Sequence, residues 1–137
     1  MKKTKINALL CCILAIICSI NFTACKKDGV SGAITGHWQL KSVINYTDGQ
    51  AEHVNAPEIG NSMIIIGDYT YHGKIYGTPL NETGTWSRNG NTFEMKDDAN
   101  NMMTFTISCD GDTLILTTTA TVNGHNYKTE YTFSSLQ

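Results

Sequence analysis

The sequence predicts an all-β fold, an eight-stranded antiparallel up-and-down barrel preceded by a signal peptide. Apolar and polar residues alternate with a period of two through most of the chain after residue 34, which is typical of strands with one buried face. Glycine, asparagine and aspartate separate these stretches at short intervals. No stretch of helical length carries an apolar stripe with a 3.6-residue period.

The first residues have the pattern of an export signal. Lys2, Lys3 and Lys5 precede an apolar run from Ile6 to Ile20, as in the charged and apolar regions of a secretory signal. The run is shorter than the ~20 apolar residues that a membrane-spanning helix needs. We therefore expect a signal peptide over residues 1–24 rather than a permanent membrane span.

A cysteine follows small residues where that signal would be cut. The tripeptide Thr23-Ala24-Cys25 resembles the lipobox of bacterial lipoproteins, and the resemblance implies that Cys25 becomes the lipid-modified first residue and anchors the protein to the membrane. Residues 26–28, Lys-Lys-Asp, place no aspartate directly after Cys25. That resemblance implies the outer membrane, on its periplasmic side or at the cell surface. The alternative is an ordinary signal peptide followed by an unmodified cysteine.

Charge and composition divide the rest of the chain in two. Residues 25–33 are polar and glycine-rich and predict a lipidated flexible tether, and residues 34–137 predict one domain. From Cys25 onward the formal charge is −5, because all twelve acidic residues remain while Lys2, Lys3 and Lys5 are lost from the ten basic ones. This acidic balance argues against a nucleic-acid partner. Cys109 is expected to be a small core residue.

The first half of the domain predicts four strands. They are Thr35–Tyr46, Met63–Ile66, Tyr69–Gly77 and Glu82–Arg88. Alternation in the first strand places Trp38, Leu40, Ile44 and Tyr46 on one face, and alternation in the third places Tyr69, Tyr71 and Ile75 together.

The second half predicts four more strands with clearer alternation. They are Thr92–Lys96, Met102–Cys109, Thr113–Val122 and a last strand from His125 to Phe133. Their apolar faces carry Phe93 and Met95, then Met103, Phe105, Ile107 and Cys109, then Leu114, Leu116, Ala120 and Val122, and finally His125, Tyr127, Thr129, Tyr131 and Phe133. Threonines dominate the opposite face of Thr113–Val122.

The connections favour closure into a single sheet. The pairs Gly67-Asp68, Asn89-Gly90, Asp110-Gly111 and Asn123-Gly124 tolerate the positive φ values that two-residue hairpins require. Such short links make neighbouring strands antiparallel. Because only the segment from Thr47 to Asn61 is long enough to cross between sheets, a barrel is favoured over a two-sheet sandwich.

One motif adds a resemblance to a known family. Gly36-His37-Trp38 opens the first strand, and Gly84-Thr85-Trp86 repeats the pattern at the fourth. A Gly-x-Trp start, a long first loop and seven further strands in simple hairpins resemble the lipocalin-like domains of bacterial lipoproteins over Ile34 to Leu136. The resemblance implies a barrel with one closed and one open end.

The predicted inward residues divide between these two ends. At the closed end we expect four packed aromatic residues, namely Trp38, Trp86, Phe93 and Phe133. Near the open end we expect a small, partly apolar ligand to be bound by Tyr46, Ile75, Met103, Phe105, Ala120, Val122, Tyr127 and Tyr131. An interior completely filled by side chains is the alternative, and the barrel would then be a protein-interaction or inhibitor module in the envelope.

No catalytic or metal-binding signature accompanies this pattern. His37, His53, His72 and His125 lack short ligand spacing, and no catalytic frame is recognisable. We therefore expect a binding protein without catalytic residues, metal or cofactor.

Overall fold

The computed structural model describes residues 34–136, which form nine strands and one short 3₁₀ helix. The elements in chain order are β1 (Gly36–Thr47), β2 (Gln50–His53), η1 (Ile59–Asn61), β3 (Met63–Ile66), β4 (Thr70–Gly73), β5 (Thr83–Asn89), β6 (Thr92–Asp97), β7 (Met102–Asp110), β8 (Thr113–Val122) and β9 (His125–Ser135). Within this range no helix is long and apolar enough to cross a membrane. The predictions for residues 1–33, including Cys25, lie outside the described residues.

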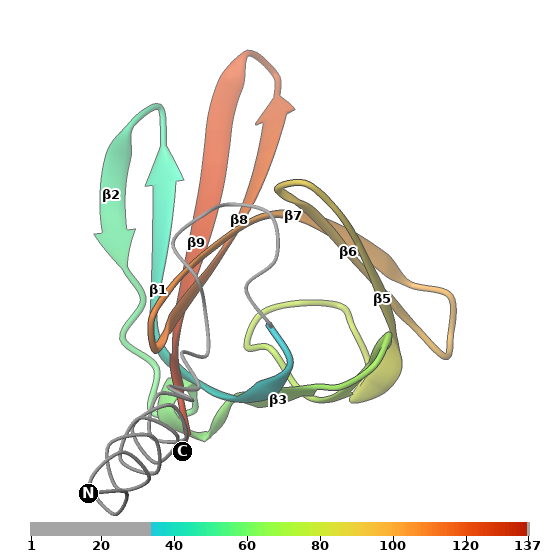
Figure 1. Cartoon of the computed structure of the whole chain (residues 1–137). Coiled ribbons are helices and arrows are strands. Elements are labelled where there is room, and N and C mark those ends of the chain that lie inside the picture. Colours follow the sequence, from blue (N-terminus) through green and yellow to red (C-terminus); the bar gives the residue numbers. More distant parts are fainter. Residues whose placement is uncertain (1–33, 137) are drawn as a thin grey trace, which may run out of the picture.

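The predicted antiparallel barrel is confirmed. The sheet runs in the order β2-β1-β3-β4-β5-β6-β7-β8-β9, and pairing of β1 with β9 closes it (Figure 1). The first residues of β1, Gly36–Gln39, pair with β3, whereas Ile44–Thr47 pair with β2. β2 is therefore an addition to the barrel wall, inside the segment predicted as one long loop.

Several strands extend beyond the closed wall as a projecting sheet. We use this name for Ile44–Thr47 of β1, all of β2, Thr118–Val122 of β8 and His125–Glu130 of β9, which pair in the order β2-β1-β9-β8. Strand β7 pairs with β8 only from Thr113 to Thr117. The β1–β2 hairpin and the β8–β9 hairpin therefore extend beyond the closed barrel, as Figure 1 shows.

A bulge in β1 changes which of its side chains point inward. The register with β9 shifts between Leu40 and Ser42, and one extra residue in a strand reverses the faces of everything after it. Leu40 is buried before the bulge and Val43 is buried after it. The prediction that Tyr46 points inward was therefore wrong, because Tyr46 lies on the face opposite to Val43.

Apolar side chains fill the interior of the barrel. Fully buried members include Leu40, Ile64, Ile66, Met95, Leu114 and Leu116, together with buried aromatic residues. Ile59 from η1 and Ile75 and Leu80 from the segment between β4 and β5 are also buried, so residues outside the strands add to this core. The predicted open end is thus plugged by its own loops.

Four aromatic residues pack at the end where β1 begins. Trp38, Phe93 and Phe133 are buried there, and Trp86 is partly buried with its ring centroid 5.5 Å from that of Phe93. The indole N–H of Trp38 donates to the carbonyl of Ile34 at 2.8 Å. Each tryptophan thus combines apolar packing with a satisfied donor, since Trp86 donates to a carbonyl at 2.9 Å.

Cys109 is partly buried and packs against the core, as the sequence predicts for a small core residue.

Candidate functional site

Half of the predicted ligand residues belong to the packed core. Ile75, Phe105 and Tyr131 are buried, and Met103 is partly buried against them. The Phe105 and Tyr131 rings meet edge to face with centroids 6.1 Å apart, and burial raises the pKa of Tyr131. These side chains fill the barrel and leave each other little room for a ligand.

The other half lie on the projecting sheet. Ala120, Val122 and Tyr127 are exposed, Val122 by 52% and Tyr127 by 42%. They continue the inward face of β8 and β9 past the point where an opposite wall exists. Tyr46 lies on the other face, so the eight predicted residues do not converge on one internal cavity.

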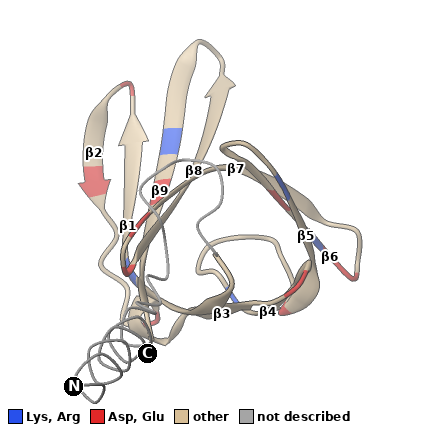
Figure 2. Cartoon of the chain, viewed as in Figure 1, with Lys and Arg blue, Asp and Glu red and all other residues tan. Residues whose placement is uncertain are grey.

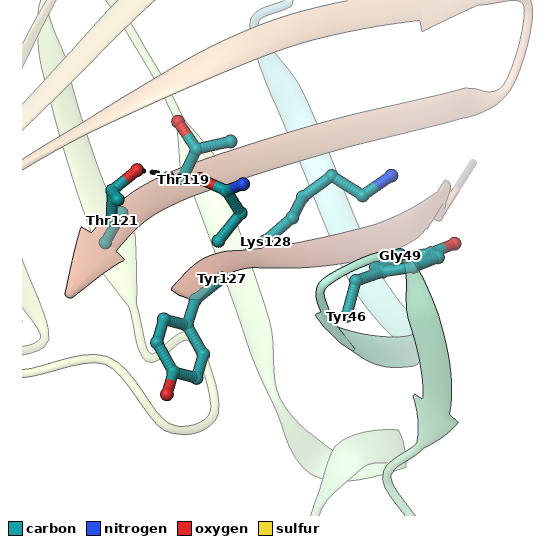
Figure 3. A pocket seen from close by; sticks show the side chains of 8 residues that line it. Tyr46, Gly49, Thr119, Thr121, Tyr127 and Lys128 are labelled. Atoms are coloured by element: carbon teal, nitrogen blue, oxygen red, sulfur yellow. Dashed lines mark hydrogen bonds between the residues drawn. The ribbon is translucent and has the colours of Figure 1, made fainter. Parts of the chain in front are cut away.

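A surface pocket on the projecting sheet collects several of these residues instead. This outer pocket has a volume of about 750 Å³ and is lined by Tyr46, Gly49, Thr119, Ala120, Thr121, Asn126, Tyr127 and Lys128 (Figure 3). Tyr46 pairs with Lys128 across β1 and β9, and Lys128 pairs with Thr119 across β9 and β8. Three neighbouring strands therefore present these side chains side by side on the same face.

The side chains of the outer pocket combine an aromatic ring with polar groups. The ammonium of Lys128 lies 3.8 Å from the centroid of the Tyr46 ring, a cation–π contact, and also 3.5 Å from the Glu130 carboxylate. The Thr121 hydroxyl donates to the Asn126 side-chain oxygen at 2.9 Å. Tyr127 points to the other side of β9, as Figure 3 shows.

Asp48 ties together the two hairpins that frame the outer pocket. Its carboxylate accepts the Asn126 backbone N–H at 2.9 Å and lies 2.6 Å from the His125 Nδ1. The contact with His125, together with that N–H, lowers the pKa of Asp48. Asp48 and Gly49 both have positive φ, so the turn that positions this carboxylate suits the twist of a tight hairpin.

A second pocket lies at the plugged end of the barrel. It has a volume of about 690 Å³ and is lined by Glu58, Asn61, Ser62, Lys74, Tyr76, Gly77, Thr78 and Glu82. The hydroxyl of Ser62 donates to the Lys74 carbonyl at 2.5 Å and accepts the Tyr76 N–H at 2.9 Å. These bonds connect the residue before β3 with the segment after β4. The side chains at the floor of this pocket therefore have a structural role.

Asp97 holds the adjoining loops. Its buried carboxylate accepts backbone N–H groups of Asn81 at 2.9 Å, Ala99 at 2.9 Å and Asn101 at 2.8 Å, and the side-chain amide of Asn101 at 2.8 Å. Burial alone would raise the pKa of Asp97, but these hydrogen bonds together hold it below the ordinary value of 3.8. The nearby Tyr71 has its pKa raised to about 12 by burial and by the charges of Asp97 and Asp98.

The described residues provide no cluster of side chains for a metal ion. Between residues 34 and 136 no group of three histidine, cysteine, aspartate or glutamate side chains is placed to hold a metal ion. Every buried side-chain nitrogen or oxygen in that range has a hydrogen-bond partner.

Sequence reasoning missed Gly49, Thr119, Thr121, Asn126 and Lys128 as members of the outer pocket. Alternation correctly assigned Lys128 and the threonines to the outward face, but a small-molecule ligand was expected only on the inward face. The missing information was the bulge after Leu40, which brings Tyr46 to the same side. Nothing in the sequence between Leu40 and Ser42 marks the extra residue, since neither glycine nor proline occurs there.

Comparison with known proteins gives one match. The family model described as a lipocalin-like domain matches residues 34–116, more than half of the chain, from before β1 into β8. No curated protein and no solved structure matched significantly.

Proposed function

The chain belongs to the lipocalin-like domain family, and from that premise we propose that it is a lipid-anchored lipoprotein of the bacterial cell envelope that binds a small, partly apolar molecule. Lipocalin-like barrels are typically binding folds rather than enzymes, and small eight-stranded barrels either fill with side chains or hold one ligand. The proposal assigns binding to the outer pocket and assigns no catalytic step.

Attachment to the outer membrane rests on the N-terminal sequence. The basic residues before the run Ile6–Ile20 support export, and the position of Cys25 after Thr23 and Ala24 supports lipid modification. Several acyl chains on one cysteine anchor a protein stably, whereas a single chain binds only marginally. A tether over residues 26–33 would then let the barrel stand off from the lipid.

A direct test of the anchor compares the wild-type chain with Cys25→Ser. We expect mass spectrometry to find acyl groups on the N-terminal peptide of the wild type, and the wild type to fractionate with outer membranes. The variant should lose both the added mass and the membrane fractionation. Membrane attachment of Cys25→Ser equal to that of the wild type would contradict the proposal.

The single observation that carries ligand binding is the convergence of Tyr46, Lys128 and Thr119 on one face of three paired strands. The ring supplies a flat apolar surface, while the hydroxyls and the Asn126 amide supply hydrogen-bonding groups. A ligand with one apolar face and a hydroxyl-bearing edge matches this chemistry. The filled interior supports a site outside the barrel.

Calorimetric titration with two probe sets, phenyl glycosides and medium-chain fatty acids, tests the outer pocket. Phenyl glycosides should bind, and Tyr46→Ala should weaken binding about tenfold, the loss of ~1.4 kcal/mol expected for a removed stacking contact. The matched control is Thr118→Val, on the opposite face from Thr119, which should leave the affinity unchanged. Binding of neither probe set, or equal losses in both variants, would contradict this site.

A second candidate function is a protein-interaction or inhibitor module in the envelope. The filled interior favours it, because core side chains such as Phe105 and Tyr131 occupy the volume that an internal ligand would need. Photo-cross-linking from position 121 on the projecting sheet and from position 94 on the barrel wall would separate the two candidates. A specific adduct from position 121 with a different protein in cells, rather than with another copy of this chain, and no probe binding in vitro would favour the module.

A further inference from the structure

The outer part of β8 is a strand edge without a neighbour among the described residues. β7 pairs with β8 from Thr113 to Thr117 and stops there, whereas β9 accompanies β8 to Val122. Residues Thr118–Val122 therefore have a partner strand on one side and, within residues 34–136, no partner strand on the other. Figure 1 shows this segment rising beyond the barrel with β9.

The direction of the backbone groups along this edge follows from Asp48. The N–H of Asn126 donates to the Asp48 carboxylate at 2.9 Å, and its carbonyl accepts the Asp48 N–H at 2.9 Å. Both groups of Asn126 thus point toward β1 and away from β8. In an antiparallel pair directly opposite residues behave alike, so Thr121, opposite Asn126, points its N–H and carbonyl away from β9.

The same reasoning applies two residues earlier. Backbone direction alternates along a strand, so Thr119 also points its N–H and carbonyl to the open side, whereas Ala120 points toward β9. Thr117 follows the same alternation, because it pairs with Thr106 of β7, on the side of β8 that faces away from β9. The edge presents two donors and two acceptors from Thr119 and Thr121.

This edge lacks the features that usually prevent strand addition. Thr113–Val122 contains no charged residue and no proline, and Figure 2 shows β8 without charge along its length. Natural sheets protect exposed edges with charges, prolines, bulges or very short strands. The opposite edge of the projecting sheet follows that rule, because β2 is only four residues long and carries Glu52 and His53.

We propose that a second copy of this chain adds to the sheet through Thr118–Val122, antiparallel and with the two-fold axis at Ala120. This register places Thr119 opposite the partner subunit's Thr121, and Thr121 opposite the partner subunit's Thr119. All four free backbone groups on each side are then paired. The two alanines at the axis form the close, non-hydrogen-bonded pair, where Cα atoms lie about 4.5 Å apart.

The chemistry of the segment favours an identical partner over a foreign strand. A two-fold interface must be complementary to itself, and an uncharged segment brings no like charges together. Alanine is small enough for the close pair at the axis, while Val122 meets the partner subunit's Thr118, so β-branched residues pack together. The proposal is independent of what the outer pocket binds, because it uses backbone groups of the edge.

Cysteine cross-linking in the full chain tests the register. Ala120→Cys should form an interchain disulfide on mild oxidation, because a separation of about 4.5 Å suits a disulfide. Val122→Cys and Thr118→Cys alone should not, because each would be about 13 Å from its own copy, at ~3.4 Å per residue. A mixture of these two variants should cross-link, since each then faces the other.

The native cysteines are present in all of these variants, so their background is matched. We expect at least fivefold more dimer from Ala120→Cys, and from the mixture, than from either single control. Equal yields in all samples, or no dimer above background, would overturn the proposal. A maximum yield from Val122→Cys would overturn the register and with it the two-fold axis at Ala120.

Sedimentation equilibrium of the full chain in density-matched detergent gives an independent readout. The wild type should associate with increasing protein concentration, and Ala120→Lys should stay monomeric because it places two ammonium groups at the axis. Unchanged circular dichroism melting would show that the variant is folded. The control His53→Lys, on the β2 edge, should associate like the wild type. A monomeric wild type, or association of Ala120→Lys equal to it, would overturn the proposal.

Discussion

The barrel body and the projecting sheet are built from the same strands but differ in what stabilises them. Phe133 and Leu114 face each other across β9 and β8 inside the barrel and are completely buried. Further along the same strands and on the same face, Val122 and Tyr127 are largely exposed. Alternation therefore determines the side to which a residue points, but burial requires an opposing wall.

In the projecting sheet, which has no opposing wall, polar contacts connect neighbouring strands and turns. Asp48 binds His125 and Asn126, and the Thr129 hydroxyl donates to the Asn45 side-chain oxygen at 2.9 Å. Exposed hydrogen bonds contribute far less than core packing. We therefore expect the projecting sheet to open locally while the barrel remains closed.

The largest expected effect comes from emptying the core. Phe133→Ala should lower the free energy of unfolding by about 3–5 kcal/mol, because a buried ring is lost and a cavity remains. Val122→Ala, on the same inward face in the projecting sheet, should change it by less than about 0.5 kcal/mol. Urea denaturation of both variants measures the contrast. Equal losses would show that the projecting sheet is part of the core.

Next in size is a substitution where two strands of the barrel approach closely. A Cβ on Gly84 would lie 2.2 Å from the Lys96 carbonyl oxygen and 2.7 Å from a ring carbon of Tyr71. Gly84→Ala should therefore cost about 1–3 kcal/mol of overpacking strain. Gly60→Ala is the control, because nothing lies within 4 Å of its Cβ position. A melting temperature of Gly84→Ala equal to that of Gly60→Ala would contradict this contact.

An intermediate effect should depend on pH and involve Asp97. Because its folded pKa is below the unfolded value of 3.8, Asp97 contributes stability that is present above that value and is lost as pH falls through the lower folded pKa. Asp97→Asn should melt at a lower temperature at neutral pH and show a smaller further loss below pH 3.8. Melting curves from neutral to acidic pH measure both.

Asp48→Asn is the matched variant on the projecting sheet. The pKa of Asp48 is also lowered, but its carboxylate joins only hairpin tips. Global melting should stay close to the wild type, while amide exchange at Asn126 should accelerate. A global loss equal to that of Asp97→Asn would break the distinction between the two regions.

The smallest effect is expected at Lys128. Removing its cation–π contact with Tyr46 by Lys128→Ala should cost no more than about 0.5–1 kcal/mol, the range for exposed pairs. Lys128→Arg should keep most of that contact and is the control. Urea denaturation measures the difference, and a loss above that range would assign a structural role to the outer pocket.

Much of the barrel follows from local patterns in the sequence. Seven of the eight predicted strands correspond closely to β1, β3 and β5–β9, and the eighth is present in shorter form as β4. Turns such as Asn123-Gly124, where both residues have positive φ, made consecutive strands antiparallel. Hairpin signals and period-two alternation are local, so they can be read without knowing the rest of the fold.

The outer pocket could not be predicted in the same way. Its members were divided between two faces because the bulge after Leu40 has no local signature, and one slipped residue moves Tyr46 to the other side. The plug of the barrel was also missed, because Ile59 lies in the short 3₁₀ helix η1 and Leu80 in a loop, and neither segment has strand alternation. The burial of Ile59 and Leu80 depends on which parts of the barrel their segments pack against, and this is set by the tertiary fold.

The sequence by itself determined eight of the nine strands, their antiparallel order and, outside the second half of β1, the apolar face of most of them, because these depend on neighbouring residues and on turn chemistry. Only the tertiary structure decided at which residues β1, β8 and β9 leave the closed barrel and on which face of the sheet Tyr46 lies. It also decided that side chains fill the interior of the barrel. Those properties depend on pairing between residues far apart in the chain, as when Tyr46 meets Lys128, and one extra residue in β1 is enough to change them.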